Sequence, residues 1–206
     1  VSSPDESAVQ AMAGDASVSA DEPTTTTVRH PDDDRPKEAC GVFAIRGPGR
    51  AVAHITYLGL YALQHRGQES AGIAASDGEH ITVTRGMGLV PHVFDDYALD
   101  ALEGDLAIGH TRYSTTGGSG VHNAQPVYRA SGTFHFALAH NGNLTNTAAL
   151  ADETAMLPGL AASDTDLMAE LIAIEAGARR EAGVSSDALL EAALGAVAPR
   201  LQGAFS

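Results

Sequence analysis

The amino-acid sequence predicts an α+β protein in which layers of sheet and helix are stacked on one another. Three observations support this prediction. The chain has 206 residues, 44% of them hydrophobic, which is enough for a substantial core. Short apolar or alternating runs that are typical of strands gather in the first two thirds of the folded part. Helical patterns lie on either side of these runs, so that helices are available to cover a sheet.

Five runs have the length and composition of strands. The first of them, CGVFAI, is a short apolar run of the kind found in buried strands. The others either alternate between apolar and polar residues or are short and bounded by glycine. The predicted strands are 40–45, 71–76, 81–86, 106–114 and 134–140, and LQGAFS at 201–206 looks like the opening of a further one.

Three stretches have helical patterns. Residues 51–66, AVAHITYLGLYALQHR, have an apolar face, and Gly67 is predicted to end this helix. A helix over residues 164–180 is predicted to begin after Ser163, because serine is a good N-cap and an aspartate follows three residues later. Another helix, over residues 187–201, follows a serine in the same way. These patterns do not define the topology of the sheet.

The N-terminal 39 residues differ in composition from the remainder. They contain no Phe, Tyr, Leu or Ile, and they carry 9 acidic and 3 basic residues. Such a segment cannot bury enough apolar surface to offset its ordering entropy. We therefore predict that residues 1–39 are a disordered acidic propeptide and that residues 40–206 form the folded domain.

Composition also excludes several classes of partner. The formal net charge is −14, whereas a nucleic acid or an anionic membrane requires a basic surface. No stretch approaches 18 uninterrupted apolar residues, so the sequence contains no transmembrane helix. A single cysteine excludes an intrachain disulfide and a metal site of several local thiolates, so we expect no cofactor in this segment. It also suits a reducing, cytoplasmic location.

The only cysteine, Cys40, stands at the boundary between the tail and the folded domain. A lone cysteine is most often a small buried apolar residue. At this boundary, however, cleavage after Ala39 would place a thiol and a free α-amine on one residue. The reference pKa of an α-amine is about 7.7–8.0, which suits a general base for a thiol of pKa about 8.5. The position therefore favours an N-terminal nucleophile.

Three polar positions suggest a binding site, although each has a simpler explanation. Arg112 ends an otherwise apolar strand, and its planar fork suits a carboxylate rather than the usual surface role. Asn141 and Gly142 read as a turn, but a turn could present the Asn141 amide and the Gly142 N–H to one oxygen. Asp164 follows the helix cap Ser163 and could hold an ammonium group.

Together these positions describe one kind of ligand. It has a carboxylate, an ammonium group and a carbonyl that a thiol attacks. An amino acid with a side-chain amide fits this description, and glutamine is the obvious case.

The ordered set of motifs from Cys40 onward resembles the glutaminase domain of the amidophosphoribosyltransferase family. The block LYALQHRGQESAGI distinguishes this family from relatives that aminate fructose 6-phosphate or aspartate. The motifs are CGVFAI, LGLYALQHRGQESAGIA, GHTRYSTTG, NAQPV, AHNGNLTN and SDTD. The resemblance implies a class II glutaminase with the four-layer αββα sandwich of the N-terminal-nucleophile hydrolases.

The resemblance also implies roles for individual residues. Cys40 corresponds to the nucleophile, and Arg112 and Asp164 correspond to the pair that binds glutamine. Asn141 and Gly142 correspond to the oxyanion hole. Arg66 lies in a family motif near the site, without a role that the sequence reveals.

The family's enzymes take ammonia from glutamine and use it to make phosphoribosylamine from phosphoribosyl pyrophosphate, the first step of de novo purine biosynthesis. The resemblance therefore implies that this chain is C-terminally truncated and lacks the phosphoribosyltransferase domain. In the full-length enzyme it further implies magnesium, a [4Fe–4S] cluster in some members, homo-oligomers, and self-cleavage of the propeptide.

Three other interpretations remain open at this level. A different amidotransferase of the same fold would transfer ammonia to another sugar or acid. A non-catalytic fragment or binding module would leave its tail uncleaved. A redox sensor would use the Cys40 thiol without binding glutamine.

Overall fold

The structure, a computed structural model, describes residues 40–113, 120–153 and 163–206. The tail predicted to be disordered, residues 1–39, lies outside these ranges, as do the last four residues of the GHTRYSTTG motif, 114–117. Among the described residues, no helix is long and apolar enough to cross a membrane.

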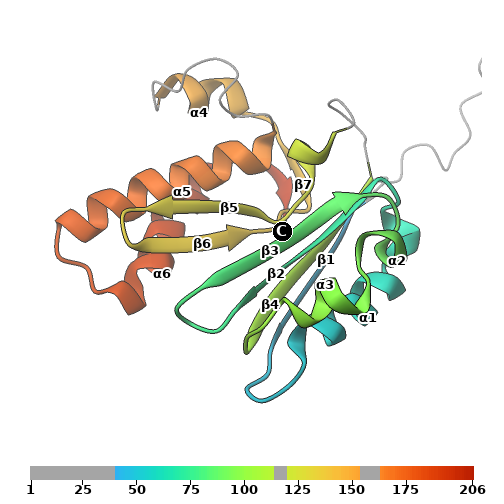
Figure 1. Ribbon diagram of the computed structural model, residues 1–206. Helices are drawn as coiled ribbons and strands as arrows, with labels where there is room; N and C mark the ends of the chain where they lie inside the picture. The colour runs from blue at the N-terminus through green and yellow to red at the C-terminus, as the bar shows by residue number, and fades with distance from the viewer. Residues whose placement is uncertain (1–39, 114–119, 154–162) are drawn as a thin grey trace, which may run out of the picture. The chain divides into compact units, whose positions relative to one another are not determined.

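A four-stranded antiparallel sheet, the main sheet, is built from the first half of the described chain (Figure 1), with the strand order β1-β4-β2-β3. Gly41 pairs with Thr111, so antiparallel pairing brings Cys40, at the start of β1, beside Arg112, at the end of β4. The strands are β1 (Gly41–Arg46), β2 (Ser70–Ser76), β3 (Ile81–Met87) and β4 (Leu106–Arg112).

Helices cover one face of the main sheet. Alternate residues of β2, such as Ile73, point toward these helices and share a core with Leu60 and Phe94. Because side chains alternate along a strand, Gly72 faces the opposite side of the sheet. The covering helices are α1 (Val52–Ala62), α2 (Val90–Val93) and α3 (Asp96–Asp100).

A second helix–sheet unit is built from the later part of the chain. A hairpin of β5 and β6 packs against α5, and α6 packs on α5. Their apolar side chains form a second core, which includes Phe136, Leu171 and Leu189. The elements are β5 (Val127–Ser131), β6 (Phe134–Leu138), α5 (Asp164–Glu181) and α6 (Ser186–Val197).

The two units stack with their sheets facing each other. β3 contacts β6, and a Cβ added at Gly72 would clash with the carbonyl oxygen of Gln125, just before β5. The order is therefore α1, main sheet, hairpin and α5, which Figure 1 shows as successive layers. This arrangement confirms the predicted αββα sandwich.

A short ribbon of two strands carries the Asn-Gly motif. Gly142 of β7 pairs with Phe205 of β8, so the predicted strand at 201–206 is confirmed over its last part. The ribbon is made of β7 (Gly142–Leu144), which α4 (Thr147–Glu153) follows, and β8 (Gly203–Phe205), which the 3-10 turn η4 (Ala198–Arg200) precedes. A further 3-10 turn, η3 (Val121–Asn123), precedes β5.

Several predicted boundaries were wrong. The helix predicted over 51–66 ends at Ala62, and the 3-10 turn η2 (Gln64–Arg66) follows it. Gly67 is extended there, so it does not end the helix in the left-handed conformation. Ser186 is the first residue of α6 rather than its cap. By contrast, Ser163 does cap α5, accepting a hydrogen bond from the Asp166 N–H at 3.2 Å.

Two strands were missed. β5 contains Arg129, which breaks the apolar pattern but pairs with Asp166 at 2.8 Å and Glu170 at 3.5 Å on α5. β7 has only three residues, and its first, Gly142, has a φ of +136° that few other residues adopt. Its pairing partner lies some sixty residues further along the chain, so no local pattern reveals it.

Candidate active site

Cys40 lies at the end of the main sheet, where β1 begins. Its side chain is partly buried, and the Sγ atom lies 3.9 Å from the carbonyl oxygen of Tyr113. Burial raises the pKa of the Cys40 thiol, and interactions with the Tyr113 backbone and the charges of Arg112 and Arg66 offset this only in part. The thiol therefore stays protonated at neutral pH and needs a base before it can attack.

The backbone carbonyl of Cys40 is held by two side chains. Arg66 donates from Nε at 2.9 Å, and Asn141 donates from Nδ2 at 3.2 Å. This contact gives Arg66 a structural role that sequence reasoning could not supply. An amide group has two N–H donors, so Asn141 can hold Cys40 with one and point the other at a substrate oxygen.

Arg112 ends β4, as predicted, with a largely buried guanidinium. It donates from Nη1 to the carbonyl of Asn123 at 2.7 Å, and its Nε lies 3.9 Å from the Glu69 carboxylate. Both Glu69 oxygens are buried, and among the described residues neither accepts a hydrogen bond. Sequence reasoning missed Glu69, although it lies within the quoted block LYALQHRGQESAGI.

Gly142 begins strand β7 rather than forming a turn, which corrects the predicted local structure. Asn141 and Ser206 exchange both backbone hydrogen bonds, at 2.9 and 2.8 Å. In an antiparallel ladder the next pair does not exchange such bonds, so the Gly142 N–H points away from β8. The predicted presentation of this N–H beside the Asn141 side chain is therefore geometrically available.

Asp164 is the first residue of α5 and lies against the β7 ribbon. Its carboxylate accepts hydrogen bonds from the backbone N–H of Leu144 at 3.3 Å and of Thr165 at 2.9 Å. The ring nitrogen Nδ1 of His140 lies 3.7 Å from the same carboxylate and 3.2 Å from the Thr165 hydroxyl. The helix N-terminus also favours a negative charge here.

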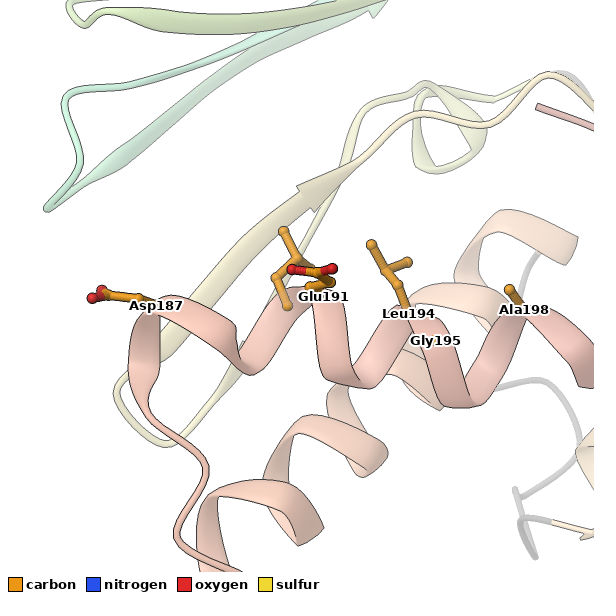
Figure 2. Close-up of a pocket in the computed structure, with 6 residues that line it drawn as sticks. Asp187, Glu191, Leu194, Gly195 and Ala198 are labelled. Atoms are coloured by element: carbon orange, nitrogen blue, oxygen red, sulfur yellow. The ribbon is translucent and has the colours of Figure 1, made fainter.

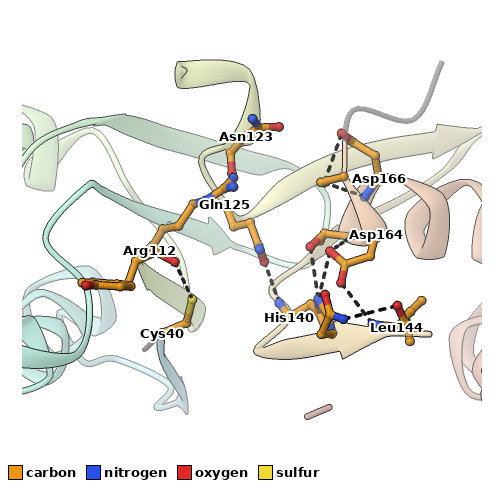
Figure 3. A network of polar contacts seen from close by, with 12 residues as sticks. Cys40, Arg112, Asn123, Gln125, His140, Leu144, Asp164 and Asp166 are labelled. Carbon is orange, nitrogen blue, oxygen red and sulfur yellow. Dashed lines mark hydrogen bonds and ion pairs between the residues drawn. The ribbon is translucent and has the colours of Figure 1, made fainter. Parts of the chain in front are cut away.

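The predicted residues thus gather in one polar region, although they come from distant parts of the chain (Figure 3). Cys40 and Arg112 come from the main sheet, and His140 and Asp164 from the hairpin side. Gln125 lies between them in Figure 3 and accepts a hydrogen bond from the His140 N–H at 2.7 Å. Gln125 and His140 were not predicted as site residues, although both belong to quoted motifs, NAQPV and AHNGNLTN.

His110 is buried between the two sheets near this region. It is fully inaccessible, and its ring lies against the backbone of His140. Burial lowers the pKa of His110 to about 3. Burial also lowers the pKa of the neighbouring His140, which the Asp164 carboxylate opposes.

We predict that His110 makes the domain less stable in weak acid. Its folded-state pKa of about 3 lies below the unfolded value of 6.5, so the unfolded state binds the proton more readily between these values. The contribution of neutral His110 to the free energy of unfolding is therefore complete above pH 6.5 and is lost as the pH falls toward 3. The free energy of unfolding should be about 2 kcal/mol lower at pH 5 than at pH 7 from this residue.

Urea unfolding of wild type and His110→Asn at pH 5 and pH 7 measures the contribution of His110 to the free energy of unfolding. The variant should show the smaller pH dependence. Equal pH dependence in both proteins would contradict the prediction.

Other features of the described surface do not coincide with the Cys40 site. A groove runs along α6 and shares no residue with the site (Figure 2). No group of three or more His, Cys, Asp or Glu residues within the described ranges is arranged to hold a metal ion. The groove is lined by Asp187, Leu190, Glu191, Leu194, Gly195 and Ala198.

Comparison with known proteins relates this chain to one family. The profile of the class-II glutamine amidotransferases matches residues 92–201, which include four of the six predicted site residues, Arg112, Asn141, Gly142 and Asp164. An amidophosphoribosyltransferase of Mycobacterium tuberculosis is 46% identical over 192 residues, covering 88% of this chain and 34% of the relative. The corresponding enzyme of Synechococcus elongatus is 58% identical over 120 residues, covering 58% of this chain and 24% of the relative.

Two solved structures of related enzymes are also similar to this chain. One described as the allosteric regulatory enzyme of purine biosynthesis superposes with a TM-score of 0.65 at 39% identity, over 80% of this chain and 34% of that one. The glutamine phosphoribosylpyrophosphate amidotransferase of B. subtilis, complexed with ADP and GMP, gives a TM-score of 0.60 at 36% identity, over 81% of this chain and 33% of that one. The chain spans about a third of the length of such relatives.

The family match and the layered fold agree with the resemblance seen in the sequence. The chain belongs to the class-II glutamine amidotransferases.

Proposed function

We propose that this chain is the glutaminase half of an amidophosphoribosyltransferase. It hydrolyses glutamine with Cys40 as an N-terminal nucleophile and supplies ammonia for phosphoribosylamine synthesis. The observation that carries the proposal is the pair of donors, Arg66 and Asn141, that hold the Cys40 backbone beside Arg112. The curated relatives that share this chain's sequence are named amidophosphoribosyltransferases.

The reaction begins when the α-amine of Cys40 takes the thiol proton. A base is needed because burial raises the pKa of that thiol. The sulfur attacks the side-chain carbonyl of glutamine, and the second N–H of Asn141 and the backbone N–H of Gly142 stabilise the oxyanion. The C–N bond then breaks, and ammonia leaves with the proton from the amine. Water hydrolyses the γ-glutamyl thioester, which gives glutamate and restores the thiol.

Glutamine is positioned through its two charged groups. The guanidinium of Arg112 binds the α-carboxylate, and Asp164 binds the α-ammonium group. The neighbouring Glu69 balances the Arg112 charge when the site is empty, which makes a buried arginine tolerable. Because both anchors are partly buried, their attraction for the ligand is screened less than it would be at the surface.

The remaining activity is proposed for the full-length enzyme. Relatives are about three times as long as this chain, which supports a phosphoribosyltransferase region that binds phosphoribosyl pyrophosphate. We assign magnesium, and an iron–sulfur cluster where one exists, to that region rather than to this chain. We further propose that the full-length enzyme is a cytoplasmic homo-oligomer and that residues 1–39 are a propeptide that is cleaved off.

The raised thiol pKa argues against a redox sensor. Redox-sensing cysteines have low pKa values, since the thiolate is the form that oxidises. Burial moves the pKa of Cys40 in the opposite direction.

The proposal is tested by the mature N-terminus. We expect active full-length enzyme to begin at Cys40, because catalysis needs the free α-amine of that residue. Intact-mass measurement identifies the N-terminus, and glutamate release from glutamine measures the activity of the same sample. Active enzyme that retains residues 1–39 would overturn the proposal. Processed enzyme without glutamate release would also overturn it.

A further inference from the structure

A short segment, Asn123–Pro126, lies between the two halves of the proposed site. From the main sheet, Arg112 donates to the Asn123 carbonyl at 2.7 Å. Arg85 of β3 donates to the Ala124 carbonyl at 2.7 Å and to the Pro126 carbonyl at 3.4 Å. The carbonyl groups of Asn123, Ala124 and Pro126 therefore hold the segment on the main sheet.

The segment also fits closely against the main sheet. The Gln125 carbonyl oxygen lies so near Gly72 of β2 that a Cβ there would clash with it. Ala124 is fully buried. This leaves the main chain at Gln125 little freedom to move toward β2.

The side chain of Gln125 reaches to the other half of the site. It is 8% exposed, and its Oε1 atom accepts the backbone N–H of His140 at 2.7 Å (Figure 3). His140 directly precedes Asn141 and Gly142, the proposed oxyanion donors. Gln125 thus connects the segment that carries Asn141 and Gly142 to the segment Asn123–Pro126, which Arg112 holds.

We propose that Gln125 is a positioning residue that sets the oxyanion donors relative to the carboxylate anchor. This inference rests on the proposed function and deepens it. Glutamine bound by Arg112 presents its amide carbonyl at a place determined by the length of the molecule. The donors must lie at that place, and a misplacement of about 1 Å can lower a rate about 100-fold.

The substitution Gln125→Met tests the inference, since it keeps the length of the side chain but removes the acceptor. In the full-length enzyme we expect kcat for glutamine hydrolysis to fall about 10- to 100-fold, with KM for glutamine changed less than about threefold. Gln125→Glu retains an acceptor oxygen for the His140 N–H and should restore most of kcat. The amide of His140 should exchange with solvent faster in Gln125→Met.

A matched control is Asn146→Leu. The Asn146 side chain also accepts a backbone N–H, that of Gln202 at 3.0 Å, and it donates to the Arg200 carbonyl at 2.9 Å, but it does not join the two halves of the site. We expect this variant to keep kcat and KM near wild type. If Gln125→Met does not fold, Arg85→Met releases the same segment from the sheet and should show the same loss of kcat.

The outcomes are distinguishable. Wild-type glutamate release tests the proposed function, whereas the ratio of variant to wild-type kcat tests the role of Gln125. The His140 amide exchange reports on the contact without reference to activity. Unchanged kcat in Gln125→Met or in Arg85→Met overturns the inference. An equal loss in Gln125→Glu also overturns it, because that variant keeps the acceptor.

Discussion

Cys40→Ser should abolish glutamate release from glutamine while phosphoribosylamine synthesis from added ammonia continues in the full-length enzyme. A serine hydroxyl is a far poorer nucleophile than a thiol beside the same amine. The backbone of residue 40 should stay in place, since Arg66 and Asn141 hold its carbonyl rather than its side chain. We expect a loss of up to roughly 10⁶-fold, the size of the effect when the nucleophile of a hydrolase is removed.

The two activities are measured side by side. The ammonia-dependent rate serves as the internal control, because ammonia does not need the glutaminase site. An electrophilic glutamine analogue should add one label to wild type at Cys40, the only cysteine of this chain, and glutamine should block it. Glutamate release that persists in Cys40→Ser would remove Cys40 from the mechanism. Loss of both activities would show a structural role instead.

Asn141→Asp should lower kcat for glutamine hydrolysis by roughly 10²–10³, the usual cost of losing one oxyanion donor. Aspartate keeps the shape of the side chain but has no N–H, so it cannot donate to an oxyanion. Its negative charge would also face the Cys40 carbonyl that Asn141 now contacts at 3.2 Å. Steady-state kinetics of glutamate release give kcat and KM separately.

Asn143→Asp is the matched control, because it makes the same chemical change two residues further along the chain, within β7. Within the described part of the chain, the Asn143 side chain makes one long hydrogen bond, at 3.5 Å, to the neighbouring Leu144 carbonyl, so we expect nearly wild-type kinetics. Equal losses in the two variants would mean that added charge disrupts the β7–β8 ribbon. In that case Asn141 would not be a specific oxyanion donor.

Local structure in this protein follows from local sequence where the signals are strong. β2 and β3 lie where short runs bounded by polar residues or glycine predicted them. Helix α5 begins directly after its cap Ser163, because that hydroxyl accepts the Asp166 N–H. The layered αββα fold and the class of enzyme were also predicted correctly. In each case the relevant residues are neighbours along the chain or form a contiguous motif.

Elements that depend on distant partners were harder to predict. β5 was missed because Arg129 interrupts its pattern, and its ion pairs with Asp166 and Glu170 exist only once α5 packs on the hairpin. The turn expected at Asn141–Gly142 is the start of β7, because β8 supplies backbone partners. Propensity favoured a turn there, and tertiary pairing overrode it.

The sequence alone determined the family of the chain and supplied the residues proposed for the site: a thiol at the boundary of the acidic tail, an arginine, an Asn-Gly pair and an aspartate. Tertiary structure determined how they are held. The hydrogen bond from Asn141 to Cys40 joins residues 101 positions apart, and that from Arg66 joins residues 26 apart. Glu69 and Gln125 also have partners that are distant in the sequence and are brought close by sheet register and layer packing. Such contacts cannot be predicted from sequence periodicity, because periodicity indicates only which face of an element is buried.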